Sequence, residues 1–89
     1  MTEASAAPAL ELVLPRLIQQ CVEILEIDGL EADANFFDFG GDSLAVVELL
    51  GAIHDEWGVE LAVDQLLSAS DLTAVAIIVT NALAHARPA

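Results

Sequence analysis

Apolar residues recur at helical spacing in the first third of the chain. At about 100° per residue, this spacing places six apolar side chains on one face and the polar side chains at its edge or beyond. The six are Leu10, Leu14, Leu17, Ile18, Cys21 and Leu25, and the polar set is Glu11, Arg16, Gln19, Gln20 and Glu23. A helix ending near Leu25 is predicted. Its start is open between Pro8 and Leu14, because Pro15 either kinks the helix or lies in its first turn.

A second stretch predicts a helix from about Ser43 to Trp57. Gly58 stops it, since glycine favours the position just after a helix. The predicted core face consists of Val46, Leu49, Leu50, Ile53 and Trp57.

The same spacing turns several residues of this second helix outward. Small apolar spots rimmed by acidic residues are typical of a surface for transient protein partners, although single exposed apolar residues are also normal. The predicted partner surface consists of Asp42, Leu44, Val47, Glu48 and Gly51.

Two further helices are expected in the last third. Residues 63–67 are long enough for one short helix, and Ser70 is expected to cap a last helix ending near Ala84. The core stripe of that last helix is Leu72, Val75, Ala76, Val79 and Leu83.

Residues 27–42 are predicted to form a long loop, because Gly29 and the Asp33-Ala34-Asn35 cluster interrupt the helical pattern. A structureless loop of this length is unusual in a small domain and is often functional. The predicted fold is all-α: a four-helix bundle with three longer helices, one short third helix and a long loop between helices 1 and 2. The predicted division is a tail at 1–9, a domain at 10–84 and a tail at 85–89.

Length and cysteine content limit the class of protein. A chain of 89 residues is one small domain with a modest core. The single cysteine, Cys21, excludes an internal disulfide. No basic-then-apolar leader opens the chain, and the apolar stretch 72–84 is too short to span a bilayer. We therefore expect a cytoplasmic monomer.

The charge of the chain is strongly negative. Fifteen acidic residues against Arg16 and Arg87 give a net charge of −13. Nucleic acids and anionic membrane surfaces are therefore excluded as partners. Such a surface speeds the encounter with basic partner proteins, although acidic residues can also serve only to keep an apolar domain soluble.

The chemistry-bearing candidate is a serine that follows two glycines. The stretch reads Phe36-Phe37-Asp38-Phe39-Gly40-Gly41-Asp42-Ser43-Leu44. The glycines free the backbone, and Ser43 then lies at the start of a helix with its hydroxyl directed outward. The alternative is that Ser43 only caps this helix. A capping box would need Glu or Gln at position 46, where Val46 stands.

Two other chemistries find little support. Gly41-Asp42-Ser43-Leu44 matches the tetrapeptide that names the GDSL esterases, whose base is a histidine three residues after an aspartate. Gly51 precedes His54 by three residues, and Ala82 precedes His85, so this spacing is missing. An EF-hand starting at Asp33 would have Phe37 at its fifth position, and Cys21, His54 and His85 are too dispersed for a zinc site. We therefore expect no catalytic residues and no metal site.

The nine-residue stretch resembles the attachment motif of acyl carrier proteins and of the peptidyl carrier domains of nonribosomal peptide synthesis. The resemblance extends from about Leu10 to Ala84. It implies that Ser43 receives 4′-phosphopantetheine from coenzyme A, in a magnesium-dependent transfer by a phosphopantetheinyl transferase. The terminal thiol then holds acyl or aminoacyl groups as thioesters. Asp42 matches the motif's aspartate, and Leu44 the leucine that faces the transferase and other partners.

The resemblance also implies the further partners and a non-catalytic role. The partners are an adenylation or acyl-loading enzyme and downstream condensation, tailoring or thioesterase enzymes. Gly40-Gly41 favours a peptidyl carrier, although Phe39 stands where those more often have leucine. Val47-Glu48-Leu49 and the acidity are closer to acyl carriers. The open alternatives are an acyl carrier of a fatty acid or polyketide pathway and an unmodified acidic helical adaptor. The initial Met1 suggests a free-standing carrier, and an excised piece of a synthase is the other possibility.

Overall fold

A computed structural model of the chain describes residues 10–85, and the predicted tail at 1–9 and residues 86–89 lie outside this range. The elements are α1 (Leu10–Leu25), the 3₁₀ helix η1 (Phe36–Phe39), α2 (Ser43–Trp57), α3 (Val63–Ser68) and α4 (Leu72–His85). No strand occurs within residues 10–85. The predicted all-α four-helix bundle with one short third helix is therefore confirmed. None of the described helices is long and apolar enough to cross a bilayer.

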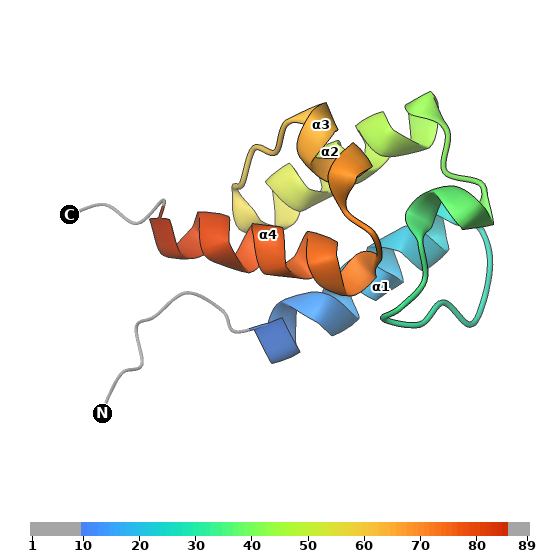
Figure 1. The fold of residues 1–89 in the computed structure, drawn as a ribbon, viewed down its shortest axis with the longest axis horizontal. Helices are drawn as coiled ribbons and strands as arrows, with labels where there is room; N and C mark the ends of the chain where they lie inside the picture. Colours follow the sequence, from blue (N-terminus) through green and yellow to red (C-terminus); the bar gives the residue numbers. More distant parts are fainter. Residues whose placement is uncertain (1–9, 86–89) are drawn as a thin grey trace.

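The helices surround one core. Figure 1 shows α1 and α4 lying side by side, and α1 also packs against α2, which in turn contacts α3. Each helix contributes fully or almost fully buried side chains, among them Leu17 from α1, Leu49 and Ile53 from α2, Leu66 from α3 and Leu72 from α4. The predicted core face of α2 is confirmed at Val46, Leu49 and Ile53, while Leu50 and Trp57 are half-buried against the core.

The buried face of α1 is rotated from the one predicted. Leu17 and Cys21 are fully buried as expected, but Val13 is also fully buried and Gln20 is only 5% exposed. Leu10, Leu14, Ile18 and Leu25 are instead half-buried and pack around the rim of the core. The placement of Gln20 at the polar edge was therefore wrong. An amide can be buried here because it bonds to the neighbouring helix.

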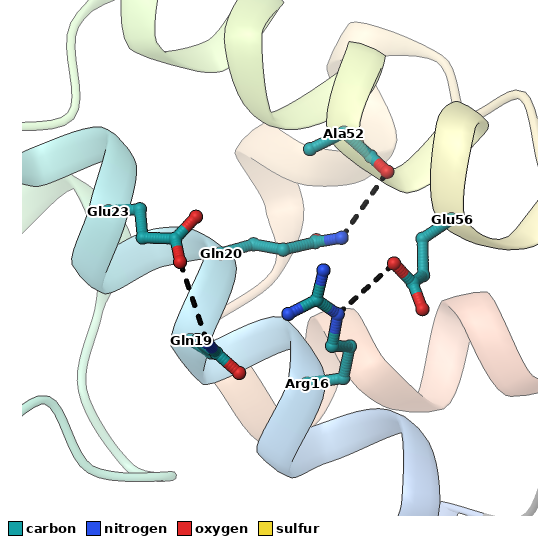
Figure 2. Close-up of polar contacts among 6 residues, drawn as sticks. All are labelled: Arg16, Gln19, Gln20, Glu23, Ala52 and Glu56. Atoms are coloured by element: carbon teal, nitrogen blue, oxygen red, sulfur yellow. Dashed lines mark hydrogen bonds and ion pairs between the residues drawn. The ribbon is translucent and has the colours of Figure 1, made fainter.

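Figure 2 shows the polar contacts between α1 and α2. The Gln20 Nε2 donates to the carbonyl oxygen of Ala52 at 3.3 Å, and Arg16 Nε donates to Glu56 Oε1 at 3.1 Å. The Arg16–Glu56 ion pair is exposed and worth only about 0–1 kcal/mol. Gln20 Oε1 has no hydrogen-bond partner among the described residues. These contacts join α1 to α2, and the hydrophobic spacing of the sequence does not predict them.

Cys21 is a core residue. Burial raises the pKa of its thiol to about 12, so the thiol stays protonated at neutral pH. Because the thiolate is the reactive form, this side chain behaves as a small buried hydrophobe.

The start of α1 resolves the question that Pro15 left open. The helix begins at Leu10, so Pro15 lies inside it and not in its first turn. Proline has no N–H to donate to the carbonyl of Glu11 and its ring crowds that carbonyl.

We expect Pro15→Ala to stabilise the fold by about 2 kcal/mol, because alanine restores the helical bond. Pro15 is exposed, so no packing is lost. Thermal melting of the variant, with exposed Gln19→Ala as the α1 control, measures the effect. An unchanged melting temperature for Pro15→Ala would show that the helix accommodates the ring without cost.

The cap of α4 also differs from the prediction. Asp71 Oδ1 accepts a hydrogen bond from Ala74 N at 2.8 Å, so Asp71 and not Ser70 is the N-terminal cap. An aspartate caps as well as a serine, and the choice depends on which residue takes the extended conformation. The core stripe of α4 is confirmed at Leu72, Val75, Ala76 and Val79, with Leu83 half-buried. The helix ends at His85, one residue beyond the predicted end.

Candidate functional site

The predicted long loop between α1 and α2 contains one turn of 3₁₀ helix, η1, just before Ser43. Asn35 precedes the turn, and its Oδ1 accepts from Phe37 N at 2.8 Å and from Asp38 N at 3.3 Å. Phe36 is buried at 3% exposure, Phe37 is half-buried, and the two rings meet edge to face with centroids 5.6 Å apart. The buried ring of Phe36 anchors the turn in the core.

Phe39 differs from the other two phenylalanines of the turn. Its side chain is 48% exposed at the end of η1. An ideal 3₁₀ period of three residues would place Phe39 on the same face as Phe36, but Phe39 is the last residue of the turn, next to Gly40, and lies at the surface.

The two glycines are needed for different reasons. Gly40 has φ of +104°, a left-handed conformation that glycine adopts without strain. Gly41 has no such φ, but a Cβ added there would lie 2.4 Å from the Phe36 ring and 2.8 Å from the Phe36 carbonyl oxygen. Gly41 N also donates to that carbonyl at 3.1 Å. Gly41 therefore serves a close approach to Phe36 and not backbone freedom.

Ser43 is the first residue of α2, and its neighbour Asp42 caps the helix. Asp42 Oδ1 accepts from Ala45 N at 2.9 Å, the bond that a capping residue makes. Ser43 is exposed, and its hydroxyl makes no hydrogen bond to any described residue. The alternative that Ser43 is only a cap is thereby removed, since Asp42 fills that role. The hydroxyl faces solvent at the end of a helix whose N-terminal N–H groups favour a negatively charged group.

A groove of about 360 Å³ lies beside Ser43. One wall is formed by the turn and the start of α2, and the other by the short helix α3. The lining residues are Phe37, Gly41, Asp42, Ser43, Val46, Val47, Val63 and Leu67. Val63 and Leu67, which the sequence placed only in a helix, are 48% and 57% exposed and make the α3 wall apolar.

All five residues of the predicted partner surface are exposed. Val47 lines the groove next to α3, and Leu44 and Glu48 line a second hollow on the α1 side. Asp42 lines both. Gly51 lies farther along α2, with nothing within 4 Å of its added Cβ. The structure thus distributes the set around both sides of Ser43, and its role in binding partners stays a prediction.

We expect Leu44→Glu and Val47→Glu to weaken partner use without unfolding the chain. Leu44 is 67% exposed and Val47 60% exposed, so neither side chain contributes much to the core. Each change should raise the KM of a modifying or loading enzyme several-fold and leave stability within about 0.5 kcal/mol. Ile77→Glu, on the exposed part of α4, is the control. A large fall in melting temperature for Leu44→Glu would show that the leucine packs in the core.

A hydrolytic site is not assembled around Ser43 among the described side chains. His54 lies eleven residues farther along α2, which is about 16 Å along the helix axis. Its ring nitrogens face Asp55 at 3.9 Å and Glu60 at 3.8 Å. The side chain of His85 lies outside the described set. Within residues 10–85, no group of three His, Cys, Asp or Glu side chains is arranged to hold a metal ion.

Asn35 is the residue of the site region that the sequence interpretation missed. The prediction assigned it only to a helix-breaking cluster, whereas the structure gives its side chain three hydrogen bonds. An asparagine directly before a compact turn is a signal for a side-chain cap. This signal could have predicted the two bonds to the turn, but not the bond to Ser70.

Comparison with known families identifies the class to which this site belongs. The model of the phosphopantetheine attachment site family matches residues 15–79, which include the turn, Ser43 and the groove. The chain therefore belongs to the phosphopantetheine attachment family of carrier domains. The cofactor predicted from the motif, 4′-phosphopantetheine, is the group that this family carries.

Relatives include parts of very large proteins. The chain is 33% identical over 60 residues to surfactin synthase subunit 1 of Bacillus subtilis, a match that covers 67% of this chain and 2% of that protein. It is 39% identical over 67 residues to the carboxylic acid reductase of Mycobacterium tuberculosis, covering 72% of this chain and 6% of the reductase. The chain thus spans only a small part of the length of these relatives.

Two solved structures share the fold. One is a peptidyl carrier protein in complex with the phosphopantetheine transferase Sfp and coenzyme A, with a TM-score of 0.77 and 28% identity over 85% of this chain and 97% of that one. The other is a docking domain complex of the Pax nonribosomal peptide synthetase, with a TM-score of 0.79 and 29% identity over 100% of this chain and 85% of that one.

Proposed function

We propose that Ser43 is the residue to which 4′-phosphopantetheine is attached, and that the chain carries acyl, aminoacyl or peptidyl groups. The observation that supports this most strongly is the free, exposed hydroxyl of Ser43 next to an aspartate that already caps the helix. A serine in this state needs no base from its own chain, because a second enzyme supplies one.

The attachment is a phosphoryl-group transfer that balances without any other reactant. The Ser43 oxygen forms a bond to the phosphorus of coenzyme A that bears the pantetheine. The bond from that phosphorus to the adenosine-bearing phosphate breaks, and 3′,5′-adenosine bisphosphate leaves. A base of the transferase would accept the hydroxyl proton, and magnesium bound there would neutralise the phosphate charge.

The residues around Ser43 fit such a group. The phosphodiester would lie at the positive end of α2, and the apolar groove beside it could hold part of the arm or its cargo. When bound, the group supplies a terminal thiol that holds acyl groups as thioesters. The contribution of this chain is to present the attachment point and an acidic, partly apolar surface.

We propose nonribosomal peptide synthesis, or related natural-product biosynthesis, as the pathway. The Gly40-Gly41 motif supports it, as do the relationships to surfactin synthase subunit 1 and to the peptidyl carrier protein bound to Sfp. The partners would then be a phosphopantetheinyl transferase, an adenylation enzyme, and condensation, tailoring or thioesterase enzymes. The match to a carboxylic acid reductase keeps acyl cargo as a second candidate, because that protein's name indicates an acid and not a peptide.

We also propose that the chain is a substrate of these enzymes and not itself a catalyst. The separation of His54 from Ser43 along α2 supports this proposal. An esterase would hydrolyse model esters unaided, so turnover by the purified chain would overturn the non-catalytic role. A cytoplasmic location remains a prediction.

Labelling of thiols tests the attachment through a property of this chain. Cys21 is the single cysteine and is buried, so the unmodified native chain should react very slowly with a thiol reagent at neutral pH. Incubation with coenzyme A, magnesium and a broad-specificity transferase should create one rapidly reacting thiol. An unmodified adaptor would gain neither mass nor a reactive thiol, and this result would overturn the carrier function.

A further inference from the structure

The segment that leads into the turn, residues 32–34, is joined to the beginning of α4 by three hydrogen bonds. Leu72 N donates to Ala34 O at 2.9 Å, and both the backbone N and the Oγ1 of Thr73 donate to Ala32 O at 3.0 Å. In Figure 1 the segment between α1 and α2, teal to green, runs beside the orange beginning of α4. Two parts of the chain about 40 residues apart are joined at this place, which we call the α4 junction.

Asn35 links the α4 junction to the turn through both ends of its amide. Its Oδ1 accepts the two N–H groups of the turn, and its Nδ2 donates to Ser70 O at 2.9 Å. A side-chain amide has both an acceptor and donors, so a single residue can satisfy backbone groups on two segments. The orientation of the amide is fixed by these neighbours, since N–H groups lie on one side and a carbonyl on the other.

From Asn35 the contacts lead in two directions to the two walls of the groove. Toward Ser43, the turn continues through Phe36, whose ring and carbonyl oxygen contact Gly41. Toward α3, Ser70 is separated from the end of that helix only by Ala69, whose N–H donates to Leu66 O at 3.2 Å. Leu66 is 1% exposed and anchors α3 in the core, which places Val63 and Leu67 at the groove.

We propose that Asn35 is a positioning residue that holds the turn before Ser43 in register with α3. The Ser43 hydroxyl and the α3 wall then keep a fixed geometry while a transferase acts on the serine. Asn35 lines neither of the two hollows that flank Ser43 but a third one, together with Asp38 and Ser70. Its effect on Ser43 is therefore transmitted through the turn. Its role in presenting the hydroxyl rests on the proposed attachment at Ser43.

Two variants distinguish the hydrogen bonds of Asn35 to the turn from its hydrogen bond to Ser70. Asn35→Ser keeps an oxygen that can accept from the turn but loses the amide donor to Ser70, whereas Asn35→Ala loses both. Ile53→Val, in the core of α2 away from the turn, is the control for a general loss of stability. All are assayed with coenzyme A, magnesium and a broad-specificity transferase, well below the lowest melting temperature.

The substitutions at Asn35 are expected to change kcat and to leave KM almost unchanged. Asn35→Ala should lower kcat roughly tenfold, because small displacements of a reacting group are costly, and should leave KM within about twofold. KM is preserved because Asn35 makes no hydrogen bond to Leu44 or Val47, so only the start of α2 at Ser43 is expected to shift while these two side chains stay exposed. Asn35→Ser should fall between Asn35→Ala and the native chain, and Ile53→Val should keep the native kcat.

Amide chemical shifts of the unmodified protein provide a readout that needs no transferase. Both Asn35 variants should shift residues 41–43 and also 63–67, on the two walls of the groove. Shifts confined to residues 34–38, or a kcat of Asn35→Ala equal to that of the native chain or of Ile53→Val, would overturn the positioning role alone. A native chain that is never modified would overturn the proposed function and, with it, the role of Asn35 in presenting Ser43.

Discussion

Ser43→Ala should abolish the gain of mass that coenzyme A and a transferase produce in the native chain. The substitution removes the only atom that can form the bond to phosphorus at this position, so no slow residual reaction is expected. The fold should survive, since Asp42 and not Ser43 caps α2 and the side chain at position 43 is exposed. Stability should change by no more than about 0.5 kcal/mol.

The matched control is Ser70→Ala, another exposed serine, whose backbone contact to Asn35 is unaffected by the change. This variant should gain one phosphopantetheinyl group at the native rate. Intact-protein mass spectrometry of both variants and the native chain gives the comparison. A mass gain in Ser43→Ala would show that the arm is attached to a different residue.

Gly41→Ala should lower the stability of the fold, because Gly41 is the glycine whose added Cβ would meet other atoms within 4 Å. The new Cβ would meet the Phe36 ring at 2.4 Å, and Phe36 is only 3% exposed, so the ring has little room to move. Overpacking of this kind costs about 2 kcal/mol, which lowers the melting temperature of a domain this small by roughly 10 °C. The turn should also shift, so modification of Ser43 should slow at temperatures where the variant is folded.

Gly51→Ala is the matched control for Gly41→Ala, because both change a glycine near or in α2. An added Cβ at Gly51 meets nothing within 4 Å, and alanine is a better helix former by about 0.5–1 kcal/mol. The two variants should therefore shift the melting temperature in opposite directions. Equal shifts in calorimetry would contradict the close approach of Gly41 to Phe36.

The sequence predicted the parts of the fold that depend on spacing along one segment. The bounds of α2 and its stop at Gly58 follow from the apolar period and from a glycine that has φ of +70°. The rotation of α1 was missed, since Val13 and Leu14 are adjacent and spacing alone does not show which one faces the core. The burial of Gln20 requires the carbonyl of Ala52, which belongs to another helix.

The sequence predicted Ser43 as the candidate site, but it did not predict the contacts that hold the surrounding turn and groove in place. The motif located the serine and its exposed neighbours, because those properties are local to the start of a helix. The contact of Gly41 with Phe36 and the bond from Asn35 to Ser70 depend on how the chain folds back on itself. The α3 wall of the groove was missed for the same reason. Val63 and Leu67 are about 20 residues from Ser43 in the sequence, and only the folded chain brings them to the same groove.

The central claim is that one hydroxyl, that of Ser43, is where the arm is attached. Fragmentation of the intact modified protein in a mass spectrometer tests it most directly, since it locates the added group without any substitution. The expected result is that every fragment containing residue 43 carries one phosphopantetheinyl group and that fragments lacking this residue carry none. Fragments lacking residue 43 that carry the group, or a chain that gains no mass at all, would contradict the account.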